Sequence, residues 1–143
     1  NKRGAEIFFH KAQIRPGKPV LFARLPDNGP FYFGLPGNPI SAAACFEFFV
    51  SPLLRLIEGN QNPLPTQTAI LKNAFIKRKA EFTFFLKARH STDENGRIAV
   101  EILDGQESFK VSPFTDMTCW AIGEAGQEHL EAGQALRIVP ISV

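Results

Sequence analysis

The segment G-L-P-G-N-P-I-S, residues 34–41, contains the residue types that most readily bind an anion. Asn38 followed by Pro39 is a typical helix start, with Asn as the N-cap and Pro at the first helical position. The first turn of a helix presents unpaired N–H groups and the positive end of the helix dipole, and Ser41 adds a hydroxyl nearby. The alternative is a tight strand-to-helix connection that needs Gly, Pro and Asn for its geometry alone.

A second candidate is a short loop that is rich in cations. Lys11, Arg15 and Lys18 lie in the segment K-A-Q-I-R-P-G-K-P, and prolines at 16 and 19 stiffen it. A rigid loop can present cations to a ligand with little loss of entropy on binding. The alternative is a solvated charged loop without a ligand.

Residue types suited to other chemistries are present without the necessary spacing. The three histidines are scattered, and Cys45 and Cys119 form no C-x-x-C pair, so we predict no metal site and two free thiols. The sequence contains no P-loop, no dinucleotide fingerprint and no Ser-His-Asp arrangement.

Composition limits the class of protein. The 143 residues are 44% hydrophobic and 21% charged, which is enough to bury a core. The formal net charge of +2 is too small for the Lys/Arg stripe of a nucleic-acid-binding protein. No apolar run approaches the roughly 20 residues that cross a bilayer, so we expect no membrane partner, and free thiols indicate the cytoplasm. Met117 is the only methionine and the chain begins at Asn1, so we expect it to be a piece of a longer protein.

The first part of the chain has the pattern of an α/β fragment. We predict strands at residues 5–9, 20–25 and 31–35, the last buried on both faces because it is wholly apolar, with a loop at 14–19. A helix should run from Pro39 to about Ile57, and Pro52 should kink or split it. One helix can cover only one face of this sheet.

A polar, proline-rich linker at residues 60–65 then precedes a region with period-two alternation. A hairpin turn is predicted at residues 93–96, where Asn95 precedes Gly96. The remaining strands are expected at 69–76, 82–89, 98–102, 118–123 and 134–141. Five or six short strands indicate a small all-β barrel or sandwich.

The two candidate segments in this order resemble one family. The molybdopterin molybdenumtransferases, called MoeA in bacteria and matched by the E domain of gephyrin in animals, typically have a K-P-G-K-P loop, an apolar strand and then G-L-P-G-N-P-V-S-A. Here R-P-G-K-P spans residues 15–19 and G-L-P-G-N-P-I-S-A spans residues 34–42. The family's F-V-x-P-L-L helix ending is similar to residues 49–54. The resemblance implies that residues 1–59 are the C-terminal end of an α/β molybdopterin-binding domain and that residues 60–143 are a C-terminal β-barrel domain.

The resemblance also implies a function. The parent protein would insert molybdenum from molybdate into adenylated molybdopterin, with a divalent cation such as Mg²⁺, and would form a homodimer. The family's acidic catalytic residues would lie upstream of Asn1, so we predict that this piece is inactive by itself. The positions that would bind molybdate or molybdopterin are Lys11, Arg15, Lys18, Gly37, Asn38, Ser41 and Ser108.

Two positions depart from the family pattern. The family's G-R-x-[DE]-F-x-R segment ends here in Phe84, and its Q-G-S signature reads Q-E-S, with Glu107 beside Ser108. A phenylalanine cannot bind an oxyanion, and a glutamate would repel one. These departures indicate either a divergent paralogue or an anion that is bound by the loop cations alone. They also favour the alternative of a non-catalytic MoeA-like interaction module that binds a peptide or protein partner. A fold relative with an unrelated anionic substrate is a third possibility.

Overall fold

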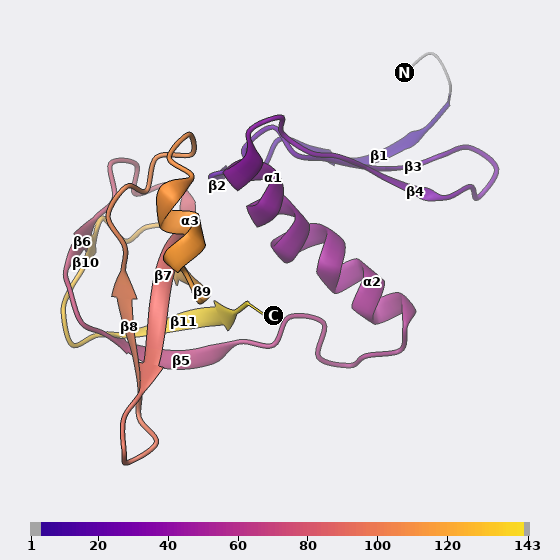
Figure 1. Cartoon of the computed structure of the whole chain (residues 1–143). Coiled ribbons are helices and arrows are strands. Elements are labelled where there is room, and N and C mark those ends of the chain that lie inside the picture. Colours follow the sequence, from indigo (N-terminus) through magenta and orange to yellow (C-terminus); the bar gives the residue numbers. More distant parts are fainter. Residues whose placement is uncertain (1–3, 142–143) are drawn as a thin grey trace.

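The computed structural model describes residues 4–141. A three-stranded sheet and a long helix form one side of the molecule, and a β-barrel forms the other side (Figure 1). Residues 58–66 connect the two sides without a helix or strand. The domain boundary after residue 59 stays a prediction.

The sheet consists of β1 (Glu6–His10), β3 (Leu21–Arg24) and β4 (Phe31–Gly34), all antiparallel in the order β1-β3-β4. Stacked phenylalanines hold its helix-facing side together: the Phe22 ring lies 4.5 Å from that of Phe33 and 4.8 Å from that of Phe8, centroid to centroid. The expected burial of residues 31–35 on both faces is wrong. β4 is an edge strand, and Tyr32 is 52% exposed because only one face of the sheet meets the helix.

The helix is continuous, but its geometry changes in the middle. It runs as α1 (Pro39–Cys45), a π-helical turn η1 (Phe46–Val50) and α2 (Ser51–Ile57). Pro52 has no N–H, and in a regular α-helix its ring would crowd the carbonyl of Phe48 four residues earlier. The wider π turn accommodates this, and the Ser51 N–H donates to the Phe46 carbonyl five residues back. The predicted split at the proline therefore takes the form of a π turn between two α-helical segments.

The length of this helix corrects one expectation. Its 19 residues are long and apolar enough to cross a membrane, so the expectation that no apolar run approaches that length is wrong. The apolar run is interrupted in the sequence by Glu47, Pro52 and Arg55, but the helix continues through all three residues. Length and composition are weak evidence for a membrane span, since the core helices of water-soluble proteins pass the same test.

The second side is a closed five-stranded barrel of mixed strand direction. Its strands are β5 (Gln67–Leu71), β7 (Thr83–Thr92), β8 (Ile98–Ile102), β9 (Cys119–Gly123) and β11 (Ala135–Pro140). The ring order is β7-β8-β5-β11-β9, and β9 pairs with β7 to close it. Only the β5–β8 pair is parallel among these five pairings. Closure excludes the sandwich alternative.

Smaller elements complete this side. β6 (Phe75–Ile76) pairs with β10 (His129–Leu130), and α3 (Ser112–Asp116) precedes β9. The strand predicted at residues 69–76 is therefore two strands, because the chain bends between β5 and β6.

One further strand joins the two sides. β2 (Ile14–Arg15) pairs in parallel with the start of β7, so two residues of the expected 14–19 loop belong to the sheet of the barrel.

Buried side chains form two clusters. The first fills the barrel: Ala69, Leu71, Phe84, Leu86, Ala88, Val100, Ile102, Cys119, Ala121, Leu130, Leu136 and Ile138. The second, which we call the shared cluster, lies between the helix and the outside of the barrel: Ile14, Val20, Ile40, Ala44, Cys45, Phe85, Met117, Trp120, Ile122 and Val139.

Candidate functional site

Asn38 begins α1 and uses both ends of its side-chain amide. Its Oδ1 accepts hydrogen bonds from the backbone N–H groups of Ile40, at 3.1 Å, and Ser41, at 3.4 Å. This N-cap confirms the predicted helix start, but it satisfies two of the N–H groups that were expected to face an anion. Its Nδ2 donates to Ser108 Oγ at 3.4 Å, across 70 residues of sequence. Two of the predicted site residues therefore meet between the two sides of the molecule.

Gly37 and Ser41, the other two candidate site residues of the segment 34–41, differ in exposure. Gly37 is exposed, and no heavy atom lies within 4 Å of where a Cβ would stand, so the backbone there is open to a ligand. Ser41 is only 7% exposed, which places it inside the junction rather than on an open surface.

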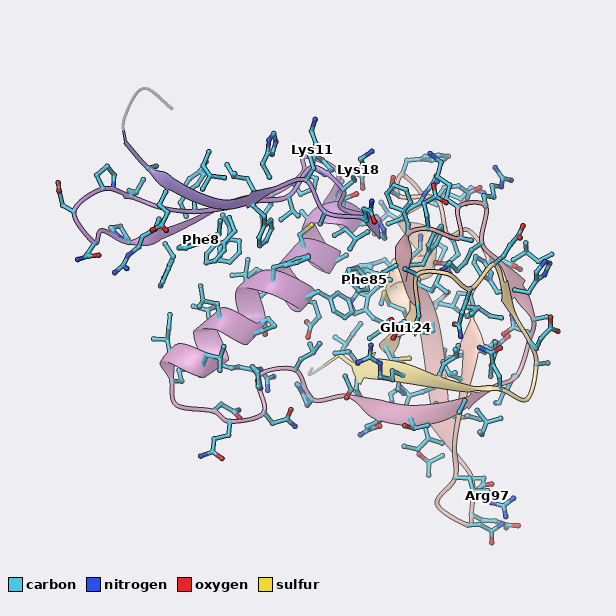
Figure 2. The ribbon with its side chains drawn as sticks, turned by 180° about the vertical axis from the view of Figure 1, so that it is seen from behind. Phe8, Lys11, Lys18, Phe85, Arg97 and Glu124 are labelled. Carbon is cyan, nitrogen blue, oxygen red and sulfur yellow. The ribbon has the colours of Figure 1, made fainter. Side chains whose placement is uncertain are left out.

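The cationic loop folds back on itself. Lys11 N–H donates to the Val20 carbonyl, and Ala12 N–H donates to the Lys18 carbonyl, both at 2.9 Å. Lys11 and Lys18 are both exposed and lie at the same end of the sheet, next to the barrel (Figure 2).

Aromatic rings of the barrel lie under the cations of this loop. The Arg15 guanidinium lies 5.9 Å from the centre of the Phe84 ring, and the Lys18 ammonium lies 5.5 Å from the centre of the Phe82 ring. Lys79 approaches the same Phe82 ring at 5.6 Å. Cation–π contact can orient these side chains without neutralising their charge.

Gly17 brings the loop against α1. Its carbonyl accepts from the Cys45 thiol at 3.5 Å, and a Cβ at this position would lie 2.5 Å from Cys45 Sγ and 3.6 Å from the Ser41 carbonyl. The loop carrying Arg15 and Lys18 is therefore docked on the first turns of the helix that Asn38 caps.

The two departures from the family pattern have different environments. Phe84 is 8% exposed and belongs to the cluster inside the barrel. Glu107 is exposed, and its carboxylate forms an ion pair with Lys110 at 3.2 Å. A hydrogen bond from its own backbone N–H, followed by that from Lys110, lowers the pKa of Glu107. Glu107 is thus charged at neutral pH, and Lys110 partly offsets that charge.

Sequence reasoning missed Lys87, which organises the segment carrying Ser108. This lysine on β7 is 1% exposed, and its Nζ donates to the carbonyls of Gly105, Glu107 and Lys110 at 2.6, 3.2 and 3.0 Å. Burial lowers the pKa of the Lys87 ammonium, with the Glu107 charge opposing the shift. The available signal was a lysine within the apolar run F-F-L-K-A, at a position that shares its face of the strand with Phe85.

Within residues 4–141, no group of three or more His, Cys, Asp or Glu side chains is placed to hold a metal ion. These residues therefore do not fit the Mg²⁺ that the resemblance implies. Both cysteines are free and buried, and burial raises the pKa of the Cys45 thiol to about 11 and that of Cys119 to about 12.

Comparison with known proteins places these residues in a family context. A family described as "Probable molybdopterin binding domain" matches residues 2–56. The chain is 32% identical over 135 residues to the molybdopterin molybdenumtransferase of Synechococcus elongatus, covering 94% of this chain and 32% of that protein. It is 28% identical over 138 residues to that of Haemophilus influenzae, covering 96% and 34%. The chain thus spans about a third of the length of these relatives.

Solved structures have the same fold. A molybdopterin biosynthesis moeA protein from Pyrococcus horikoshii superposes with a TM-score of 0.74 at 24% identity, covering 94% of this chain and 32% of that one. Another structure of a moeA protein from the same organism gives a TM-score of 0.71 at 26% identity, with the same coverage.

Proposed function

Because the chain belongs to the molybdopterin molybdenumtransferase family of molybdenum cofactor biosynthesis and spans about a third of its relatives, we propose that it is part of an enzyme that inserts molybdenum from molybdate into adenylated molybdopterin. Molybdopterin and molybdate are the substrates in this proposal. The chain supplies one wall of their binding site.

The observation that carries this proposal is that the cationic loop and the Asn38–Ser108 pair both lie at the junction of the two sides. Arg15 and Lys18 lie on a loop whose Gly17 touches α1, and Asn38 at the start of α1 reaches Ser108 on the barrel. Cations beside hydroxyl and amide donors suit a tetrahedral oxyanion, whether molybdate or the phosphate of the pterin. Lys11 adds a further positive charge at the base of the same loop.

The rest of the reaction would need residues outside this chain. Acidic residues upstream of Asn1 would hold Mg²⁺ and handle the nucleotide, and the full-length protein would work as a cytoplasmic homodimer, without a membrane or nucleic-acid partner. The 143-residue chain would be inactive alone. A molybdenum-insertion assay tests this, and turnover above a no-protein control would contradict it.

Isothermal titration of the full-length protein with molybdate or tungstate tests the binding role directly. We expect Arg15→Ala and Lys18→Ala each to weaken binding by about fivefold or more, because a charge-assisted contact is lost. Arg97→Ala is the matched control, since Arg97 lies at the tip of the β7–β8 hairpin, far from the junction (Figure 2). If both loop variants bind like the unchanged protein, the cationic loop has no role in binding.

Phe84 favours the alternative of a non-catalytic interaction module that binds a peptide or protein partner. A buried ring stands where the family has an arginine, so the barrel contributes no cation at that position. The sequence of the parent protein upstream of Asn1 tests the enzyme proposal: absence of the metal-binding acids would contradict it and favour the interaction module.

A further inference from the structure

We propose that Lys87 is a positioning residue of this site: its buried ammonium holds the segment of residues 105–110 in the conformation that places Ser108 against Asn38. This inference rests on the proposed function, because it concerns the same binding site.

The first support is the hydrogen bonding of the ammonium. An ammonium has three N–H donors, and three backbone carbonyls within one six-residue segment accept them, those of Gly105, Glu107 and Lys110. Within residues 4–141 the Lys87 ammonium forms no ion pair, so carbonyl dipoles replace the water it loses on burial. Two of these carbonyls, at 107 and 110, lie on either side of Ser108 in the sequence and restrain it from both directions.

The second support is a link from the same segment back to the Lys87 backbone. Gln106 Oε1 accepts from the Lys87 N–H at 2.9 Å. Its Nε2 donates to the Lys87 carbonyl at 2.8 Å and to the Leu103 carbonyl at 2.6 Å. The segment is therefore fastened to β7 through both the side chain and the backbone of one residue. β7 is hydrogen-bonded to β8 on one side and to β9 on the other, so the segment is attached to a strand that is held on both edges.

The third support is what this segment presents. Ser108 Oγ accepts from Asn38 Nδ2 at 3.4 Å, and Asn38 also caps α1. A displaced segment would withdraw the serine hydroxyl from the junction while leaving Arg15 and Lys18 in place, since these stand on a different loop. Loss of Lys87 should therefore weaken anion binding through Ser108 alone.

The test compares two buried lysines of similar chemistry. Lys77 is also fully buried, and its ammonium donates to the carbonyls of Gly123 and Glu124, at the end of β9, rather than to the Ser108 segment. Lys77→Met therefore reproduces the loss of a buried, carbonyl-bound ammonium, and Lys87→Met adds the loss of the Ser108 support. Gln106→Ala is a second variant that loosens the same segment without removing a buried charge.

The measurements are molybdate affinity by titration calorimetry and amide hydrogen exchange of residues 105–110, both in the full-length protein. We expect Lys87→Met, Gln106→Ala and Ser108→Ala each to weaken molybdate binding by about fivefold, and Lys77→Met by less than about twofold. Lys87→Met in a Ser108→Ala background should cause no further loss. Hydrogen exchange at 105–110 should become faster in the Lys87 and Gln106 variants only.

Three results would overturn the inference. Equal affinity for Lys87→Met and Lys77→Met would make Lys87 a structural residue while leaving the proposed function intact. Additive losses for Lys87→Met and Ser108→Ala would show that Lys87 does not act through the serine. If the unchanged protein binds no molybdate, the proposed function fails, and the role of Lys87 in that site fails with it, whatever the exchange rates show.

Discussion

Asn38 shows how one side chain can stabilise an element and also shape a site. Its side-chain oxygen Oδ1 caps the helix by accepting from N–H groups two and three residues later. Its side-chain nitrogen Nδ2 donates across the junction to Ser108. The two roles use different atoms, so substitutions can separate them.

Asn38→Ala should lower the free energy of unfolding by about 1 kcal/mol, because the helix loses its N-cap. Asn38→Asp should keep that stability, because a carboxylate caps equally well and favours the helix dipole. Both variants should bind molybdate more weakly, since neither can donate to Ser108 and aspartate adds a negative charge. Urea unfolding and calorimetry measure the two effects. Equal loss of stability in both variants would disprove the capping role.

The burial of the two thiols predicts that they react slowly at pH 8 in the folded protein. Since burial raises the pKa of Cys45 to about 11 and of Cys119 to about 12, almost no thiolate exists at pH 8 in the folded protein. We expect an aromatic disulfide reagent at pH 8 to modify neither thiol in the native chain and both after unfolding in denaturant. Rapid modification of one equivalent under native conditions would contradict the buried positions.

Residue-level prediction from sequence succeeded where the signal was local. The cap at Asn38 and the proline at the first helical position depend on neighbours within three residues, and both were predicted. The role of Lys87 was not, because alternation gives the face of a strand but not what covers that face. Its partners come from a separate segment 18 to 23 residues away.

At the scale of elements, the contact between the cationic loop and the helix depends on the absence of a side chain at Gly17. Gly17→Ala should destabilise the chain for two reasons: its φ is +111°, and the new Cβ would overlap Cys45 Sγ. Gly59→Ala is the matched control, since its φ is +83° with nothing within 4 Å. We expect about 1 kcal/mol for Gly59→Ala and about 1–3 kcal/mol more for Gly17→Ala, measured by urea unfolding. Adding Cys45→Ala should recover part of the difference; no recovery would show that the sulfur is not the obstacle.

Phe48 is one of the helix residues that pack against the barrel. Its ring stacks on that of Phe85 with centroids 3.6 Å apart and lies nearly perpendicular to that of Trp120, with centroids 6.2 Å apart. Phe48→Ala should lower the free energy of unfolding by about 3 kcal/mol and shift the emission of the only tryptophan to longer wavelength. Phe109, which is 72% exposed, provides the control, and Phe109→Ala should change neither quantity. An unchanged emission spectrum in the Phe48 variant would contradict the contact with Trp120.

The sequence predicted most elements but not how they assemble. Period-two alternation predicted β7 and β8 because each has one face inside the barrel, and strands were also expected where β9 and β11 lie. An apolar run alone could not show that β4 is an edge strand, since exposure depends on what packs on the second face. The pairing of β2 with β7 was missed because two residues are too few to show a period.

At the scale of the whole molecule, the shared cluster contradicts any picture of two independent bodies. Five of its ten residues come from the first 45 residues and five from the barrel region. If the two sides separated, the apolar side chains of both would become exposed to water. Trp120 lies within this cluster and is 2% exposed.

We therefore expect the chain to unfold as one cooperative unit. Helix content by far-UV circular dichroism and the environment of Trp120 by fluorescence should report the same urea midpoint, because the helix and the tryptophan belong to one cluster. Two separated midpoints would show that the barrel survives without the helix.

The order of strands around the barrel also has a consequence during protein synthesis. β11 lies between β5 and β9, yet it is the last of the five strands to leave the ribosome. Until Ala135–Pro140 emerges, β5 and β9 each keep an unpaired edge, and the interior side chains remain accessible to other nascent chains. The strands made first therefore form an open sheet with two unpaired edges, and this sheet can close into a barrel only when its final strand becomes available.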